Sequence, residues 1–547
     1  MEIVQFKIKG MTCDHCAQTI EKVLTAQAGI LEKEVSYSEA KGKFVFDPSQ
    51  ISKDKIKEAI NATGHYQVVG ELENEGDKYK FDLIIIGGGS AAFSAATTAH
   101  EKGGRVLIIN EGLPIGGTCV NVGCIPSKHL IRVAESIHRA SFSNFDGVEF
   151  SRPNVNFKQI IQGKRQLVET LRRKKYMDVI KNKEGIQFLK GWASLIDSSS
   201  VQVGAFIYKS PRILLASGSG TRIPNIKGIE TIDYLNHTSL FELEKLPQSL
   251  TVLGAGYIGL EIATAYSRMG AKVRILEFTD RPLRSVTPDI SYEIVKHMEN
   301  EGIEFYPNYR IDKFVKRNDG VDINGKNART GKEFNFFEEG KIVIATGVKA
   351  NTSNMGLEEL GLKMDDNSKI IVNEKQETNV HGIYAAGDCA NTPSFVYTAA
   401  AEGRTAALNA LDQAGVETSY TGLPWVVFTD PQVAGAGMDE HEAAEKGIPV
   451  ETSTISLADV PLAIAANDMR GFIKLIRNPD TDALLGIRVV AHEGGELVMQ
   501  GSLAIKYGIP VQEIANSLFP YLTLSEGIKL AAIGFHKDVS ELSCCAV

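Results

Sequence analysis

The 547-residue sequence lacks any apolar run long enough to cross a lipid bilayer. It also lacks an excess of basic charge, because 59 Lys and Arg residues stand against 67 Asp and Glu residues and the net charge is -8. This balance argues against a nucleic acid or an anionic membrane as partner. Near the N-terminus, Ile3, Phe6 and Ile8 alternate with charged residues. That is not the pattern of a secretory signal, so we expect a cytoplasmic protein.

Cysteine is scarce, with seven residues in the chain, but most of them stand in close pairs. The pairs are Cys13/Cys16, Cys119/Cys124 and Cys544/Cys545, and Cys389 stands alone. In a cytoplasmic protein, close pairs indicate metal binding or redox chemistry rather than a disulfide framework. We expect Cys389 to be packed and unreactive, since no partner cysteine is near it in sequence.

The central motif is the segment 116–128, which reads GGTCVNVGCIPSK. Apolar residues recur at helical spacing after it, so a helix should begin close to Cys124. A thiol near a helix N-terminus feels the positive end of the dipole, which lowers its pKa. Two cysteines in one loop, at least one of them activated, indicate a redox-active pair. The alternative is two buried cysteines that lie near one another without function.

Two segments combine a strand, a glycine-rich loop, a helix and a second strand that leads to an acidic residue. The first has strands at 81–86 and 105–109 with Gly87, Gly89, Ala92 and Glu111; the second has strands at 249–253 and 273–276 with Gly254, Gly256, Gly259 and Glu277. Such a unit binds the pyrophosphate of a dinucleotide at the helix N-terminus and a ribose at the acid. Two units therefore predict two dinucleotides.

Residues 1–70 predict a small separate module. Strand and helix patterns follow in the order βαββαβ, which suits a ferredoxin-like sandwich. Cys13 and Cys16 lie between the first strand and the first helix, where two soft sulfur ligands suit Cu(I), Zn(II) or Hg(II). A thioredoxin-like motif and a structural zinc site are the alternatives. The charged segment 71–80 predicts a flexible linker.

The cysteine motif resembles the redox-active disulfide of the flavin disulfide reductase family, and GMTCDHC at 10–16 resembles the heavy-metal-associated domain. The resemblance implies two doubly wound α/β dinucleotide-binding domains, one for FAD and one for NAD(P), plus an α+β interface domain. The implied boundaries are 81–225 with 350–395 for FAD, 226–349 for NAD(P) and 396–547 for dimerisation. The latter domain implies a homodimer whose active sites are shared between subunits.

The resemblance also implies roles for single residues. Tyr257 matches a tyrosine that covers the flavin until nicotinamide displaces it. Lys128 and Glu261 match a Lys–Glu pair beside the flavin. Further FAD-binding residues implied in this way are Gly117, Thr118 and Asp388.

Within that family the C-terminal segment resembles the mercuric reductases. Disulfide-reducing members carry an HPTxSE motif whose His is the acid/base, and here Tyr521 stands in that position. A tyrosine with a pKa near 10 cannot shuttle protons at neutral pH as His does. Mercuric reductases share this tyrosine, a second one at Tyr176, and a tail with paired cysteines, here Cys544 and Cys545.

This resemblance implies reduction of Hg(II), delivered as a thiol complex, to volatile Hg(0). Adjacent cysteines have Cα atoms about 3.8 Å apart, shorter than a relaxed disulfide needs, so the tail pair should be easily reduced and available as two soft ligands. The implied metal ligands are the three cysteine pairs. A membrane mercury transporter and an organomercurial lyase are candidate donors. The rival functions are a reductase of a small disulfide with a regulatory metal arm, and a metal carrier without activity.

The sequence leaves the nicotinamide cofactor open. The family resemblance favours NADPH. Glu277 favours NADH, because an acid at this strand end binds a ribose 2′-hydroxyl and repels a 2′-phosphate. Arg281 and Arg284 follow closely and could hold that phosphate.

Overall fold

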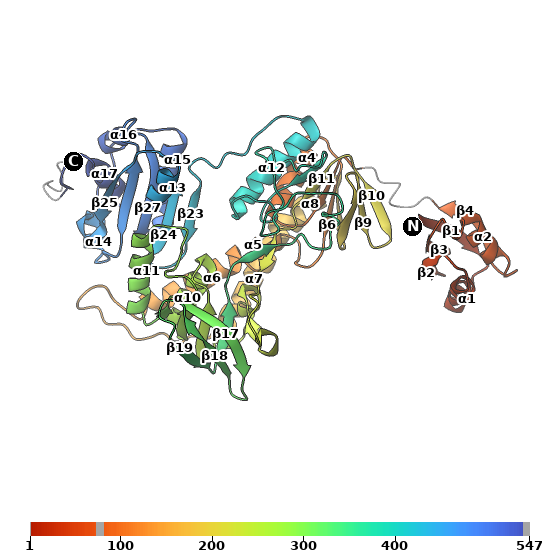
Figure 1. The fold of residues 1–547 in the computed structure, drawn as a ribbon, viewed down its shortest axis with the longest axis horizontal. Coiled ribbons are helices and arrows are strands. Elements are labelled where there is room, and N and C mark those ends of the chain that lie inside the picture. The colour runs from red at the N-terminus through yellow and green to blue at the C-terminus, as the bar shows by residue number, and fades with distance from the viewer. Residues whose placement is uncertain (1, 73–80, 540–547) are drawn as a thin grey trace. The chain divides into compact units, whose positions relative to one another are not determined.

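A computed structural model describes residues 2–72 and 81–539 (Figure 1). It separates into two compact units. The first contains Met1–Gly117, Tyr176–Gly218 and Ala350–Thr418, and the second contains Thr118–Lys175, Ser219–Lys349 and Ser419–Val547. Parallel sheets flanked by helices confirm the predicted α/β class. Within the described ranges, no helix combines the length and the apolar character needed to cross a bilayer.

The N-terminal arm, residues 2–72, has the predicted βαββαβ order and an antiparallel sheet in the order β2-β3-β1-β4. Its elements are β1 (Glu2–Lys9), α1 (Asp14–Thr25), β2 (Ile30–Ser36), β3 (Lys41–Phe46), α2 (Lys53–Asn61) and β4 (Gln67–Leu72). Alternate residues of β1 (Val4, Phe6 and Ile8) are buried with Ile20 and Leu24 of α1. β4 includes Glu71 and Leu72, the start of the expected linker; residues 73–80 lie outside the described residues.

The first unit also contains a parallel five-stranded sheet in the order β22-β11-β5-β6-β7. The strands are β5 (Leu83–Ile86), β6 (Val106–Asn110), β7 (Ile186–Lys190), β11 (Ile213–Leu215) and β22 (Ile383–Ala385). An antiparallel sheet of β8 (Ala193–Asp197), β9 (Ser200–Val203) and β10 (Phe206–Lys209) accompanies it, and α8 (Asp178–Lys181) precedes β7. Strands β5, β6 and β11 are almost wholly apolar, as burial on both faces requires.

Helix α12 (Val396–Asp412) packs against α4 (Ser90–Glu101), the helix of the first glycine-rich loop. Small side chains allow this close approach, and a Cβ atom at Gly403 would lie 2.1 Å from the carbonyl oxygen of Ala91. The expected dimerisation domain began at residue 396, but α12 belongs with the first unit, which extends to Thr418. A sequence boundary drawn at the end of a motif could not show this packing.

In the second unit a parallel sheet has the order β13-β20-β14-β15-β16. Its strands are β13 (Tyr234–Leu235), β14 (Ser249–Leu253), β15 (Lys272–Leu276), β16 (Glu304–Tyr306) and β20 (Lys341–Ile344); the helices are α9 (His237–Leu240), α10 (Tyr257–Met269) and α11 (Pro288–Asn300). An antiparallel sheet of β17 (Tyr309–Lys316), β18 (Val321–Asn327) and β19 (Glu333–Glu338) lies in the same unit, and β12 (Ser219–Thr221) pairs with β21 (Val348–Ala350).

The C-terminal part of the second unit is an antiparallel sheet in the order β23-β24-β27-β26-β25, with α15 and α17 packed on it (Figure 1). The strands are β23 (Pro424–Val427), β24 (Gln432–Gly437), β25 (Glu451–Ser456), β26 (Phe472–Arg477) and β27 (Leu484–Ala491); the helices are α13 (Glu440–Glu445), α14 (Pro461–Ala465), α15 (Gly494–Lys506), α16 (Val511–Asn516) and α17 (Glu526–Ile533). The sequence predicted one strand over 426–433. The chain instead turns at residues 428–431, where the Asp430–Pro431 peptide is cis.

Residues 118–175, expected in the FAD domain, group with the second unit. Helix α6 (Cys124–Arg139) packs along α10, and α7 (Phe157–Arg172) packs on α6. Helix α6, which follows the cysteine motif, therefore contacts α10 of the nucleotide-binding part and also Phe428 in the loop between β23 and β24.

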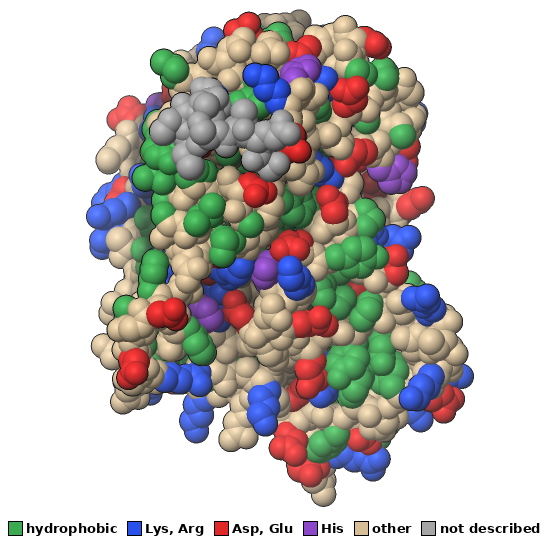
Figure 2. All heavy atoms as spheres, turned by 90° about the vertical axis from the view of Figure 1, so that its left-hand side faces the viewer, with side chains coloured by type: hydrophobic (Ala, Val, Ile, Leu, Met, Phe, Trp, Pro, Cys, Tyr) green, Lys and Arg blue, Asp and Glu red, His purple; other side chains and the backbone are tan. Residues whose placement is uncertain are grey.

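Hydrophobic side chains lie in separate groups among charged ones on the face shown in Figure 2. In the C-terminal part, Met499, Leu503 and Tyr507 are 45%, 48% and 72% exposed. Their four-residue spacing along α15 and its C-cap places them on one helix face. Large exposed apolar side chains at one face favour association with another protein surface.

Candidate active site

The cysteine pair lies where two helices meet. Cys119 is in the short helix α5 (Gly117–Asn121), and Cys124 is the first residue of α6, as predicted. The Cys119 thiol donates a hydrogen bond to the Cys124 sulfur, which lowers the pKa of Cys124 to about 7 and raises the pKa of Cys119. Burial opposes the shift at Cys124, and the charge of Lys128 adds to it. A thiolate at Cys124 is thus available at neutral pH, beside a protonated Cys119.

Lys128 lies one helical turn after Cys124 and is fixed by Glu261 of α10. Its Nζ donates to Oε2 of Glu261 at 2.7 Å and lies 4.3 Å from the ring centroid of Phe428. Oε1 of Glu261 accepts the backbone N–H of Phe428 at 3.1 Å. Three segments far apart in sequence therefore meet at one buried carboxylate, and the structure joins the Lys–Glu pair that the sequence predicted.

The first glycine-rich loop follows β5 and is closed by the backbone of residues 116–117. The N–H of Gly116 donates to the carbonyl of Gly88 at 2.7 Å. Gly117 has φ +63°, and a Cβ there would lie 2.6 Å from the Cα of Gly89. No side chain among the described residues caps α4 at Gly89, so its first N–H groups suit a pyrophosphate. The cradle fits the dinucleotide part of FAD.

Asp388 follows β22, whose carboxyl end lies at the same sheet edge as the glycine-rich loop because the strands are parallel. The neighbouring N–H of Gly387 donates to Oε2 of Glu402 at 2.7 Å, and Glu402 is fully buried. Glu402 was not predicted, because no sequence motif marks it. Cys389 is buried, as predicted, and burial raises the pKa of its thiol.

The remaining residues predicted at this first site are Glu111, Ala92 and Thr118. Glu111 follows β6 directly, and its Oε1 accepts the N–H of Gly112. Ala92 is fully buried in α4, where its small side chain allows close packing on the sheet. Thr118 is the second residue of α5 and falls in the second unit.

The second glycine-rich loop connects β14 to α10. Gly254 has φ +101°, and a Cβ there would lie 2.5 Å from the carbonyl oxygen of Ala345. A Cβ at Gly259 would lie 2.1 Å from the carbonyl oxygen of Gly254, whereas Gly256 faces open space. Only glycine allows this close strand–helix contact, and the open backbone at Gly256 leaves room for a phosphate.

Glu277 closes this second loop from the end of β15. Its Oε2 accepts the N–H of Ala255 at 2.6 Å, and its Oε1 accepts the N–H and hydroxyl of Thr279, each at 2.7 Å. A carboxylate offers about four acceptor positions, so one remains on Oε2. The guanidinium of Arg281 instead donates to the carbonyls of Arg284 and Val286.

The arm carries a second pair of thiols. Cys13 is the N-cap of α1, and its Sγ lies 3.7 Å from that of Cys16. Hydrogen bonds from Thr12, and a weaker one from the Tyr66 hydroxyl, lower the pKa of Cys16 to about 6. Tyr66 was not predicted, because it lies fifty residues from the motif and only the fold brings it there. A partly exposed thiolate in the first turn of a helix suits a soft cation.

The two predicted active-site tyrosines belong to different units. Tyr176 belongs to the first unit and lies in a π-helical turn, Arg173–Met177, with its ring 4.8 Å from that of Phe93 in an edge-to-face arrangement. Tyr521 is half exposed, beside Leu522 in a left-handed conformation. Cys544 and Cys545 lie outside the described residues.

Family models match nearly the whole chain. Residues 81–403 match the pyridine nucleotide-disulphide oxidoreductases, 423–532 their dimerisation domain, and 5–65 the heavy-metal-associated domain. The chain belongs to the pyridine nucleotide-disulphide oxidoreductase family.

The relatives of this oxidoreductase place it with the mercuric reductases. It is 36% identical to the mercuric reductase of Lysinibacillus sphaericus over 100% of both chains, and 36% identical to that of Staphylococcus aureus over 98% of both. A mercuric reductase of Streptomyces lividans is 39% identical over 85% of this chain and 98% of its own. The resemblance to mercuric reductases that the sequence predicted is confirmed. As a member of this family, the chain is a flavin enzyme that uses a pyridine nucleotide.

A solved structure shares the fold of this oxidoreductase. The Cu(II) complex of the HOCl-induced flavoprotein disulfide reductase RclA from Escherichia coli matches with a TM-score of 0.73 and 26% identity, over 82% of this chain and 98% of its own. That protein is a disulfide reductase, so the rival activity predicted from the sequence belongs to a protein of the same fold.

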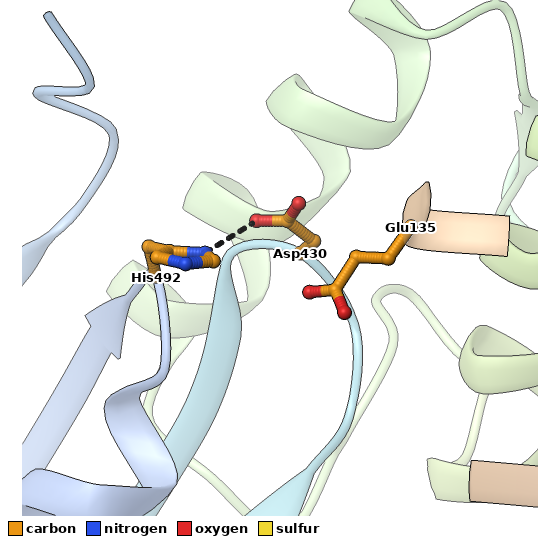
Figure 3. A group of neighbouring side chains, drawn as sticks. All are labelled: Glu135, Asp430 and His492. Carbon is orange, nitrogen blue, oxygen red and sulfur yellow. Dashed lines mark ion pairs between the residues drawn. The ribbon is translucent and has the colours of Figure 1, made fainter. Parts of the chain in front are cut away.

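Within the described ranges, one group of three side chains in this oxidoreductase has ligand atoms close enough for a metal ion. Glu135, Asp430 and His492 place these atoms within 4.8 Å of one another (Figure 3). Glu135 and Asp430 also line a cavity of about 240 Å³ between α6, α10 and the loop before β24. Lys128 lines the same cavity.

Arginines already occupy the carboxylates of this group. Asp430 accepts from Arg268 at Oδ2 (2.8 Å) and from Arg470 at Oδ1 (3.0 Å), and Oε2 of Glu135 accepts from Arg132 at 2.8 Å. A cation would enter against three guanidinium groups and would break three charge-assisted hydrogen bonds. The group is therefore an ion-pair junction that joins α6, α10 and the C-terminal sheet.

Proposed function

We propose that this enzyme reduces Hg(II) to Hg(0) with electrons from a reduced nicotinamide. The balanced reaction consumes one NAD(P)H and one Hg(II) and yields NAD(P)+, one proton and Hg(0). The arrangement of Cys119 and Cys124 carries the proposal. Two soft sulfur ligands of different acidity lie side by side, so one binds Hg(II) as a thiolate and the other loses its proton as it binds.

FAD, held at the first glycine-rich loop, would pass two electrons from the nicotinamide to the cysteine site. The chain supplies the environment for this transfer. Lys128 places a positive charge one turn from the Cys124 thiolate, and Glu261 fixes the ammonium group by a 2.7 Å hydrogen bond. We propose Cys124 as the thiolate beside the flavin and Cys119 as the substrate-facing thiol.

Tyr521 distinguishes this proposal from reduction of a small disulfide. Cleavage of a disulfide needs a proton for the leaving thiolate, which His supplies in disulfide-reducing relatives and tyrosine cannot supply near pH 7. Displacement of thiolates from Hg(II) needs no acid of that kind, since thiolates exchange directly on the metal. The fold shared with a disulfide reductase keeps the second activity as the alternative.

We propose that Cys13/Cys16 and Cys544/Cys545 collect Hg(II) and pass it to Cys119/Cys124 by stepwise thiolate exchange, with Tyr176 and Tyr521 beside the receiving pair. The exposed apolar face of α15 supports association into a homodimer, in which each tail serves the partner's site. The cytoplasm, where thiols stay reduced, is the proposed location. A membrane transporter or an organomercurial lyase remains the proposed source of the metal.

The geometry of Glu277 supports NADH as the preferred nicotinamide, against the NADPH implied by family resemblance. Its free acceptor position suits a ribose hydroxyl, and its charge would repel a 2′-phosphate. Arg281 is engaged with backbone carbonyls, which leaves Arg284 as the exposed cation nearby.

The test is anaerobic oxidation of NADH and of NADPH with Hg(II) in excess thiol, and separately with oxidised glutathione and lipoamide, while volatile mercury is trapped. Cofactor oxidation that depends on Hg(II), with an equal amount of Hg(0) released, is expected. Turnover with a disulfide alone would replace the proposal by the alternative.

A further inference from the structure

An indole side chain is fixed across a glycine in the C-terminal sheet. Trp425 on β23 pairs with Gly435 on β24, which in turn pairs with Arg488 on β27. A Cβ at Gly435 would lie 2.5 Å from Cζ2 of Trp425 and 2.9 Å from Cδ of Arg488. The indole and the arginine stem therefore meet above the glycine, an arrangement in which an aromatic ring covers a glycine of a neighbouring strand.

Arg488 makes this support rigid. It is only 2% exposed, and its guanidinium donates to the carbonyls of Ala436 at 2.8 Å and Gly437 at 3.1 Å. Its Cζ lies 5.9 Å from the centroid of Trp425, within the range of a cation–π contact. The indole is therefore backed by strand β24 and by a buried cation.

Tyr257 contacts the same indole. The ring centroids of Tyr257 and Trp425 are 6.0 Å apart at an interplanar angle of 42°. Tyr257 is the first residue of α10 and directly follows Gly256, which faces open space. The Tyr257 ring thus lies between the second glycine-rich loop and the fixed indole of Trp425.

We propose that Trp425 is a positioning residue that holds Tyr257 in its resting place and thereby opposes dinucleotide binding. The inference rests on the proposed binding of a nicotinamide at the second glycine-rich loop, and on the role that the family resemblance implies for Tyr257, which the nicotinamide displaces. If the protein mostly occupies a conformation that the dinucleotide cannot bind, its apparent affinity for the dinucleotide is lowered. Loss of the Tyr257–Trp425 contact should therefore strengthen dinucleotide binding by roughly two- to tenfold, which corresponds to the free energy of an aromatic pair.

The first experiment uses the indole as its own reporter. The chain has two tryptophans, and Trp192 is 77% exposed, so Trp192→Phe leaves Trp425 as the only one. The FAD-loaded Trp192→Phe enzyme is titrated with NAD+ and with NADP+, and Trp425 emission is recorded. A saturable change is expected, retained with Tyr257→Phe and lost with Tyr257→Ala. The inference would be overturned if Trp425 emission changed in the same way in Tyr257→Ala. It would also be overturned if the emission of the Trp192→Phe enzyme did not change although calorimetry showed that the nucleotide binds.

The second experiment measures dissociation constants by calorimetry on the FAD-loaded parent, Trp425→Ala, Tyr257→Ala and the double variant. Trp425→Ala should bind NAD+ about two- to tenfold more tightly, and the double variant should gain no further. Trp425→Phe should stay within about twofold of the parent, which controls for misfolding, and Trp192→Ala is the matched control. Weaker binding by a folded Trp425→Ala, or additive effects, would contradict the inference.

Neither readout involves mercury. If nucleotide binding follows the pattern above but Hg(II) reduction fails, only the proposed function is lost. If the parent binds neither nucleotide, both fail together.

Discussion

Nζ of Lys128 lies 2.7 Å from Oε2 of Glu261, although 133 residues separate them in the chain. The contact fixes a positive charge one turn from Cys124, and that charge helps to lower the pKa of Cys124 to about 7. The acidity of the redox pair therefore depends on helix α10 as well as on its own loop.

Replacement of Lys128 by Met should raise the pKa of Cys124 and slow its alkylation. The thiolate is the reactive form, so the rate at pH 7 should fall by about three- to tenfold and the midpoint of the pH profile should move upward. Iodoacetamide labelling of the reduced enzyme, read at Cys124 by peptide mass spectrometry, measures both. Arg132→Met removes a charge one turn further along α6 and is the control. An unchanged midpoint in Lys128→Met would dismiss the electrostatic account.

Replacement of Gly117 by Ala should impair FAD binding through a steric clash. Its Cβ would lie 2.6 Å from the Cα of Gly89, so the loops must separate. Gly112→Ala is the matched control, because Gly112 also has a positive φ but the nearest atom to its Cβ is 3.8 Å away. We expect the control to lose only about 1 kcal/mol of stability. The ratio of flavin to protein after purification measures the difference, and equal ratios would rule out the close approach as its cause.

Replacement of Thr12 by Val in the arm should raise the pKa of Cys16. Thr12 supplies the hydrogen bonds that contribute most to the value of about 6. At pH 6.5, alkylation of Cys16 in the full chain should therefore slow by roughly fivefold. Thr25→Val, whose hydroxyl bonds the carbonyl of Glu21 instead, should leave the profile unchanged. Equal profiles for both variants would refute the role of Thr12.

His492 predicts a loss of thermal stability as pH rises. Its ion pair with Asp430, in which Nδ1 lies 3.7 Å from Oδ1, raises the pKa of His492 above its ordinary value. A raised folded-state pKa gives stability that is complete below about 6.5 and is lost as pH rises through the folded value. The melting temperature should therefore fall by about 1–2 °C more in the parent than in His492→Gln between pH 6 and pH 8.5. The exposed His441→Gln serves as control, and parallel curves for parent and His492→Gln would contradict the linkage.

The paired cysteines of the tail predict a selective loss of turnover. A Cys544→Ala/Cys545→Ala variant should lose most Hg(II)-dependent NAD(P)H oxidation in excess thiol, because no carrier competes with the small thiol for the metal. Dinucleotide binding, measured by calorimetry, should stay at the parental level. Unchanged turnover would remove the tail from the mechanism.

The sequence alone determined the features whose cause is local. Glycine-rich loops need particular backbone angles, and a helix begins where apolar spacing and a suitable N-terminal residue coincide. The positions of Gly87, Gly254 and Cys124 and the βαββαβ order of the arm followed from such rules. In each case the physical cause lies in residues that are close together in the sequence.

Tertiary structure decided what depends on segments distant in sequence. The Tyr66 contact to Cys16, the packing of α12 on α4 and the meeting of Tyr257 with Trp425 have no signal in spacing or composition. Each is set by strand register or helix packing between separate segments, and one residue of shift would turn the side chain to another face. For that reason the reactive groups could be named from the sequence, but the neighbours that hold them could not.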